Sequence, residues 1–240
     1  MSALPRFVAA SLVVAALAGL AACAGAPGSG GSGPPADAPA YRVGDRWVYH
    51  GEDGFRVKTE WNETHEITAI ASEGITARIT LKGGIDLTRN ELWSAPGQVK
   101  VGAVYDNTTR RFEQPLQRFN FPLAPGQTWN QWVWNYNEST KERGQINRYV
   151  SVSGWETVTT PAGTFDAIRM QVIMRLDDET FWRFATTCNY LVWYAPAVKA
   201  VVREERRAQY VEKSNDSSGG AGTIRTQFGV VQLMSFTPGP

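Results

Sequence analysis

The sequence predicts an all-β fold, a single antiparallel domain of about ten to twelve strands arranged as a curved sheet or a partly closed barrel. Two observations lead to this prediction. Short segments rich in Val, Ile, Thr, Tyr and Trp recur along residues 41–237, separated by Gly, Pro, Asn and Asp. Most of the connections between them have the length of hairpin turns, which join antiparallel strands, and long helical periodicity is scarce.

The first half of the domain contains six segments that we expect to form strands. The clearest is residues 75–81, because apolar and polar side chains alternate there as in a strand with one buried face. Turn-forming sequences such as Gly83-Gly84 and Pro96-Gly97 lie between the segments. The expected strands cover residues 42–50, 55–71, 75–81, 85–93, 99–105 and 112–121.

The second half contains the clearest hairpin. Pro161-Ala162-Gly163 joins two long segments, and Pro fixes φ for a turn while Gly supplies a positive φ. Residues 198–213 leave an alternative open, because the charge spacing of Arg203 to Arg207 would also suit a helix. The expected strands cover residues 128–136, 143–160, 164–176, 179–187, 191–195, 198–212 and 223–236.

Residues 1–22 have the pattern of a lipoprotein signal peptide. Arg6 is followed by an uncharged run that is shorter than the roughly 20 residues of a transmembrane helix. The run ends in Leu20-Ala21-Ala22-Cys23, which resembles the lipobox of bacterial lipoproteins. The resemblance implies cleavage before Cys23 and a lipid anchor on it, and Ala24 in place of Asp implies sorting to the outer membrane. A plain secretory signal or an uncleaved helix anchor is the alternative.

Residues 23–40 are the expected lipidated cysteine and a flexible linker. The segment after Cys23 consists of Gly, Pro, Ser, Ala and a single Asp, a composition typical of extended tethers. Its typical reach is about 20–25 Å, so the folded part would stand away from the bilayer. The remaining residues 41–237 are enough for one domain with a core of its own.

The charge balance excludes one class of partner. The sequence has 24 Lys and Arg against 23 Asp and Glu, and removal of residues 1–22 would take away one basic residue, Arg6. A near-neutral domain has no bulk attraction for nucleic-acid phosphates. The expected partners are therefore the membrane, through the covalent lipid anchor, and an apolar ligand or an envelope protein.

Three motifs carry a resemblance that spans most of residues 41–205. They are residues 41–49 (YRVGDRWVY), 158–167 (VTTPAGTFDA) and 193–204 (WYAPAVKAVVRE). In this order and spacing they resemble a broad set of uncharacterised exported bacterial proteins grouped as domain of unknown function 3108. The resemblance implies a mostly antiparallel β fold in the cell envelope, and it implies no catalytic residues.

The sequence offers no recognisable motif for catalysis, for a cofactor or for a metal. His50 and His65 are the two histidines, and in a strand Glu63 shares a face with His65. Two ligands fall short of the three or four of a zinc site, so we expect an exposed strand and no metal. Glu204 and Glu205 would point to opposite faces of a strand, which does not suit the carboxylate pair of a glycoside hydrolase. We therefore expect a protein that is not an enzyme and that has no cofactor.

Aromatic residues are dense in one expected strand. Trp132, Trp134 and Tyr136 share a face, and Trp129 lies on the other. Two interpretations are open: the three residues line a groove for an apolar or sugar ligand, or both faces pack into a core. Cys188, in an aromatic segment without a nearby histidine, is expected to be buried rather than reactive.

Together these features predict an outer-membrane-anchored lipoprotein that faces the periplasm. Its non-catalytic β domain would bind an apolar ligand or an envelope component. One alternative is a structural or assembly protein that uses a sheet edge or an aromatic surface. The other is an envelope enzyme that acts on glycans.

Overall fold

The computed structural model describes residues 31–240 except 55–58, 85, 106 and 214–221. The described residues form twelve antiparallel strands in one closed barrel, which confirms the all-β prediction. The strands are β1 (Arg46–Asp53), β2 (Thr59–Ala71), β3 (Gly74–Lys82), β4 (Leu87–Ala95), β5 (Gln98–Gly102), β6 (Arg110–Gln117), β7 (Thr128–Asn137), β8 (Glu142–Thr160), β9 (Gly163–Arg175), β10 (Thr187–Ala195), β11 (Ala200–Val211) and β12 (Ile224–Thr237).

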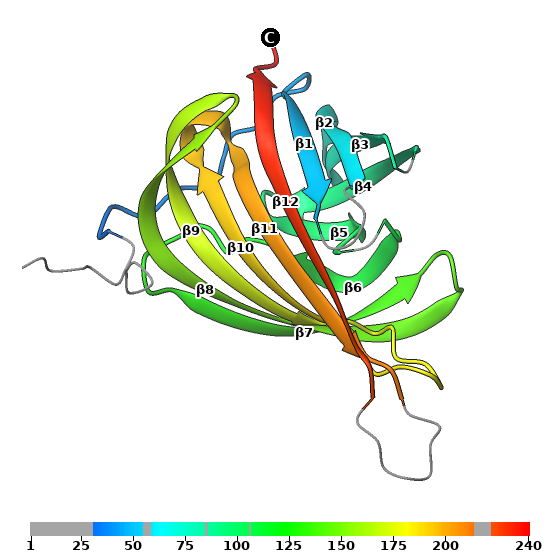
Figure 1. Ribbon diagram of the computed structural model, residues 1–240. Coiled ribbons are helices and arrows are strands. Elements are labelled where there is room, and N and C mark those ends of the chain that lie inside the picture. Colours follow the sequence, from blue (N-terminus) through cyan, green and yellow to red (C-terminus); the bar gives the residue numbers. More distant parts are fainter. Residues whose placement is uncertain (1–30, 55–58, 85, 106, 214–221) are drawn as a thin grey trace, which may run out of the picture.

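Each strand pairs with the next in sequence, and β12 returns to pair with β1 (Figure 1). The strands each have one apolar face, and a sheet that closes on itself buries this inner face in every strand. In β3, Ile75, Ala77, Ile79 and Leu81 are all buried and their neighbours are more exposed, as the alternation predicts. None of the described residues forms a helix that is long and apolar enough to cross a membrane.

The expected hairpin at residues 161–163 joins β8 to β9. Thr160 pairs with Gly163, whose φ of 136° lies in a region that favours glycine. β8 also contains a β-bulge between Val152 and Gly154, where Gly154 has a φ of 137°. Bulges bend and twist a strand, and Figure 1 shows β8 and β9 curving strongly around one side of the barrel.

The backbone pairing between β6 and β7 is short. Backbone pairing there covers only Arg110–Phe112 against Asn135–Asn137. Beyond it, the Gln131 side chain accepts a hydrogen bond from the Gln117 backbone amide at 2.8 Å and donates one to the Pro115 carbonyl at 3.0 Å. A side chain therefore holds β7 to β6 where Pro115 has no N–H for a ladder.

Two expectations about secondary structure in the second half of the domain differ from the structure. Residues 179–187 form a loop that reaches β10 only at Thr187, because Asp178 accepts hydrogen bonds from the Thr186 amide at 2.7 Å and its hydroxyl at 2.6 Å. The helix alternative for residues 198–213 is wrong. That segment is β11, which has a full strand partner on each side, in β10 and in β12.

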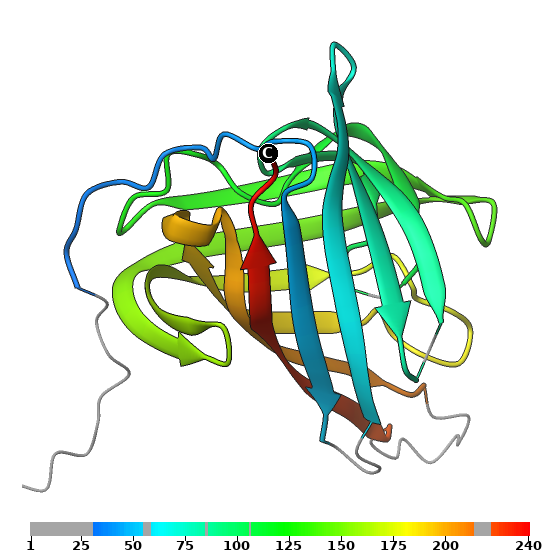
Figure 2. The same ribbon diagram turned by 90° about the horizontal axis from the view of Figure 1, so that it is seen from above.

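Residues 31–40, expected as the end of a flexible linker, instead run along the barrel (Figure 2). Gly31 and Trp155 exchange backbone hydrogen bonds of 2.9 and 3.0 Å, and Ala36 and Leu123 exchange two of 2.8 Å. Gly33 allows the chain to approach Trp155 closely, because a Cβ atom at Gly33 would lie 2.3 Å from the indole ring. Cys23 and the signal sequence lie outside the described residues.

Candidate functional site

A cavity of about 190 Å³ lies inside the barrel. An apolar cavity of roughly 150 Å³ is known to hold a benzene molecule, so this space is large enough for a small organic ligand. Apolar side chains from β9, β10 and β12, including Val172, Met174, Val192 and Val231, form part of its lining. Aromatic rings contribute further lining, among them Tyr41, Trp47, Tyr49, Trp93, Tyr105, Phe119 and Tyr190.

The lining is also highly charged for the interior of a barrel. Charged groups are costly to bury unless they are paired, so their partners decide what the cavity can bind. Five basic and three acidic side chains reach it: Arg89, Arg118, Arg148, Lys199 and Arg206, and Glu63, Glu91 and Glu204.

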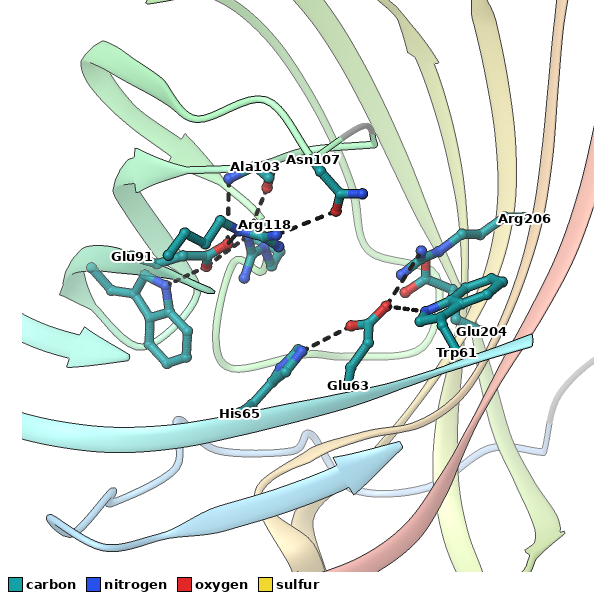
Figure 3. A network of polar contacts seen from close by, with 11 residues as sticks. Trp61, Glu63, His65, Glu91, Ala103, Asn107, Arg118, Glu204 and Arg206 are labelled. Carbon is teal, nitrogen blue, oxygen red and sulfur yellow. Dashed lines mark hydrogen bonds and ion pairs between the residues drawn. The ribbon is translucent and has the colours of Figure 1, made fainter. Parts of the chain in front are cut away.

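Glu63 on β2 is the centre of the first cluster. Its carboxylate accepts hydrogen bonds from Trp61 Nε1 at 2.8 Å and from His65 Nε2 at 3.0 Å. Arg206 NH1 lies 4.0 Å away, and Figure 3 shows Glu63 between His65 and Arg206. Burial alone would raise the pKa of Glu63, but the His65 hydrogen bond and the Arg206 charge outweigh it. The pKa of Glu63 is therefore well below its ordinary value.

The position of Trp61 depends on a glycine in the neighbouring strand. Gly51 in β1 pairs with Trp61, and a Cβ atom at Gly51 would lie 2.2 Å from the indole ring. The indole can donate to Glu63 because no side chain stands there. The expectation of an exposed, solvated strand at Glu63 and His65 is therefore wrong, since Glu63 is only 6% exposed. Among the described residues, no group of three or more His, Cys, Asp or Glu could hold a metal ion.

Glu91 on β4 is the centre of the second cluster and is 2% exposed. It accepts hydrogen bonds from Trp93 Nε1 at 3.0 Å, Arg118 NH2 at 3.1 Å and the Ala103 amide at 3.3 Å (Figure 3). Arg89 Nε adds an ion pair at 3.6 Å. Burial would raise the pKa of Glu91, but the charges of Arg118 and Arg89 outweigh it and lower the pKa.

Two further basic residues of the lining also have carboxylate partners. Arg206 Nε lies 2.5 Å from Glu204 Oε1 on the same strand, β11. Lys199 Nζ donates to Asp45 Oδ2 at 2.8 Å, and the Asp45 side chain is fully buried. Because strand neighbours alternate, Glu204 faces the cavity while Glu205 pairs with Arg203.

Asp45 also holds together three segments at one end of the barrel. It accepts hydrogen bonds from the Arg42 amide at 2.8 Å and from the Gly239 amide at 2.9 Å. Figure 2 shows the C terminus beside the chain that leads into β1. Burial would raise the pKa of Asp45, but the hydrogen bonds from Lys199, Gly239 and Arg42 outweigh it and lower the pKa.

Arg148 on β8 is the exception among the basic residues of the lining. It is 7% exposed, and its NH1 donates to the Gln117 carbonyl at 2.7 Å. No carboxylate among the described residues lies within ion-pair distance of it. Burial and the nearby charge of Arg118 lower the pKa of Arg148 to about 9. The Tyr190 hydroxyl, also in the lining, is buried without a hydrogen-bond partner in the described part of the chain.

The aromatic residues singled out from the sequence lie elsewhere. Trp132, Trp134 and Tyr136 are 56%, 40% and 38% exposed on the outer face of β7, and they do not line the cavity. Arg143 covers the Trp134 ring at 3.9 Å. The interpretation that both faces of this strand pack into a core is therefore wrong. Cys188 is fully buried, as expected.

The sequence-based reasoning missed the charged interior. A signal is present in β8, where Arg148 stands at two-residue spacing between the buried Ile146 and Val150. A charged residue within an apolar row of a strand points a charge into the core, which indicates either a partner or a ligand.

We expect the barrel to lose stability in acid. Asp45, Glu63 and Glu91 have lowered pKa values in the folded state, so unfolding raises their proton affinity. Their contribution to the stability of the fold is fully present above the pKa values of the unfolded state, near pH 4. It is lost as the pH falls toward the lower pKa values of the folded state. The urea midpoint should therefore fall steadily from about pH 5 to pH 3. A midpoint that stays constant over this range would contradict the pairing of these carboxylates.

No family model and no curated protein matches this sequence. Two solved structures match its fold. A candidate lipoprotein from Parabacteroides distasonis is 13% identical with a TM-score of 0.50, over 85% of this chain and 100% of that one. A candidate exported protein with a YmcC-like fold from Bacteroides fragilis is 14% identical with a TM-score of 0.49, over 84% and 99%. At 13% identity, the likeness to the Parabacteroides distasonis protein concerns the fold alone.

Proposed function

We propose that this chain is an exported lipoprotein whose barrel binds a small molecule with an apolar body and does not transform it chemically. The cavity of about 190 Å³ inside the barrel carries this proposal, because aromatic and apolar side chains line it together with charged groups, most of which are paired with one another. This combination is typical of sites that bind small molecules.

The state of the interior carboxylates favours binding over acid–base catalysis. A carboxylic acid that donates a proton near neutral pH needs a raised pKa. Glu63 and Glu91 have lowered pKa values and remain ionised, since arginine charges and hydrogen bonds stabilise the carboxylates. They are therefore suited to holding charged side chains in place.

The lipid anchor is the second part of the proposal, and Cys23 in the lipobox-like sequence supports it. The Parabacteroides distasonis structure belongs to a candidate lipoprotein, which is in accord with this role. We expect Cys23→Ala to release the protein from the outer membrane or to leave it as unprocessed precursor. Fractionation and mass measurement test this. A Cys23→Ala protein that remains in the membrane fraction at mature size would overturn the anchor.

Native mass spectrometry of protein isolated from its own host tests ligand binding. We expect an additional mass that is lost on denaturation. Val192→Phe, which fills part of the cavity, should lower the fraction of protein that carries this additional mass. Trp132→Ala on the outer face of β7 should leave that fraction unchanged. If the native protein carries no additional mass, and no small molecule raises its melting temperature, the binding proposal fails.

The exposed aromatic face of β7 supports a second candidate function, docking of an envelope protein. Exposed Trp and Tyr residues are enriched at protein interfaces. Trp132 is 56% exposed and Trp134 is 40% exposed. The alternative of pairing through a sheet edge has less support, since the twelve strands close into a barrel. Loss of a co-purified protein in Trp132→Ala, with the cavity ligand retained, would favour docking.

A further inference from the structure

We infer that the ligand of the cavity carries one negative charge, a carboxylate on an apolar body, and that Arg148 binds this carboxylate with help from the Tyr190 hydroxyl. The inference rests on the proposed function, because it requires that the cavity holds a ligand. It adds the chemical class of that ligand and the residues that recognise it.

The balance of charges around the cavity carries the first step. Glu91 pairs with Arg118 and Arg89, Glu204 and Glu63 pair with Arg206, and Asp45 pairs with Lys199, so these clusters balance only when they are taken together. With Asp45 included, five basic side chains face four carboxylates. The basic residue that remains is Arg148, which has one hydrogen bond to a backbone carbonyl and no carboxylate partner among the described residues. The excess is therefore one positive charge.

An uncompensated charge in this position is costly to the fold. Arg148 is 7% exposed, so little water reaches its guanidinium group. A buried charge without a counterion destabilises a protein unless a partner arrives. A ligand carboxylate would supply that partner, since a guanidinium group binds a carboxylate through two parallel hydrogen bonds. A phosphate monoester carries more than one negative charge near neutral pH and fits the single excess charge less well.

The positions of Arg148 and Tyr190 suit a shared ligand. Arg148 pairs with Met174 of β9, and Tyr190 of β10 pairs with Val172 of β9. Their side chains therefore flank an apolar floor that Val172 and Met174 form, and all four residues line the cavity. The strands β8 and β10 lie about 10 Å apart, which long side chains can bridge through one head group. The Tyr190 hydroxyl has a donor to offer, because it is buried without a partner in the described residues.

The rest of the lining suits an apolar body. Val192 and Val231 line the cavity together with aromatic rings such as Trp93 and Tyr105. These groups can bury a short alkyl chain or an aromatic ring, while Glu63, which shares the single cation Arg206 with Glu204, disfavours a second negative charge. The cavity thus selects a monoanion with an apolar tail.

Calorimetric titration of the ligand-free protein with matched eight-carbon probes tests the inference. Ligand-free protein is obtained by unfolding in urea, dialysis and refolding. We expect octanoate to bind about 10–100-fold more tightly than octanol, because a charge-assisted pair replaces a neutral contact. Octylamine should bind more weakly than octanol, and octyl phosphate more weakly than octanoate.

Variants separate recognition of the anion from binding of the tail. Arg148→Met should abolish the preference for octanoate over octanol and raise the melting temperature by about 2–4 °C, since it removes an uncompensated buried charge. Tyr190→Phe should lower the affinity for octanoate about 3–10-fold, which corresponds to the loss of one hydrogen bond. Trp132→Ala on the outer face of β7 is the matched control and should bind octanoate like the native protein.

The outcomes distinguish the two proposals. Equal affinity of the native protein for octanoate and octanol overturns the anion inference and leaves the binding function standing. The same conclusion follows if Arg148→Met keeps the native preference for octanoate over octanol. Tighter binding of octyl phosphate overturns the choice of a monoanion. Failure of all four probes, together with an absent native mass adduct, overturns the proposed function itself. If Arg148→Met does not fold, Arg148→Gln and Tyr190→Phe provide the same comparison.

Discussion

Glu91→Gln is expected to lower the free energy of unfolding by about 3 kcal/mol at neutral pH, because it removes a buried charge from paired cations. Glu91 is 2% exposed and lies between Arg118 and Arg89. The amide of Gln is neutral, so both guanidinium groups lose their counterion. Arg118 is partly exposed, and solvent reduces the loss below the upper end of the usual range. Urea denaturation followed by tryptophan fluorescence measures the change.

Glu113→Gln is the matched control for this variant. Glu113 also pairs with an arginine, Arg143, through two hydrogen bonds of 2.7 and 3.1 Å, but both residues are exposed. We expect this control to keep nearly the native stability, since exposed pairs contribute little. A second variant combines Glu91→Gln with Arg118→Met and should recover part of the loss. If Glu91→Gln is as stable as Glu113→Gln, the cluster around Glu91 does not stabilise the barrel.

The strands could be predicted from the sequence because their signal is local. The alternation in residues 75–81 and the turn at residues 161–163 each depend on neighbouring residues, and both are present in the structure. Closure of the barrel has no such local signal. It depends on pairs such as Trp47 with Phe236, which lie at opposite ends of the chain. A two-residue period shows which residues share a face, and the pairing of the first and last strands decides whether the sheet closes.

The candidate site was hidden for the same reason. Glu91 and Arg118 are 27 residues apart, and nothing in their immediate sequence marks them as partners. The prediction that both aromatic faces of β7 pack into a core was wrong for a different reason. Trp129 faces inward, while Trp132 and Trp134 face outward. Periodicity separates these two faces correctly, but it does not tell which of two aromatic faces is buried. Only the charge within an apolar row at Arg148 gave a local sign of the interior site.

Asp45→Asn is expected to cost about 3 kcal/mol of unfolding free energy, because Asp45 is the acceptor for three donors, two of which come from distant parts of the chain. Its fully buried carboxylate binds Lys199 Nζ and the amides of Arg42 and Gly239, which joins the start of β1, the turn before β11 and the C terminus. The Asn side chain keeps one acceptor oxygen and has no charge for Lys199. Urea denaturation measures the loss, and hydrogen exchange at the Gly239 amide should accelerate.

Lys199→Met is the informative partner variant, because it removes the ion pair and leaves both backbone hydrogen bonds to Asp45 in place. Lys199 is partly exposed, so we expect this variant to cost less than Asp45→Asn, about 1 kcal/mol. Exchange at the Gly239 amide should then stay near the native rate. If the two variants cost the same and both release the C terminus, the ion pair alone joins the segments. If neither accelerates exchange at Gly239, the C terminus is held by contacts other than Asp45.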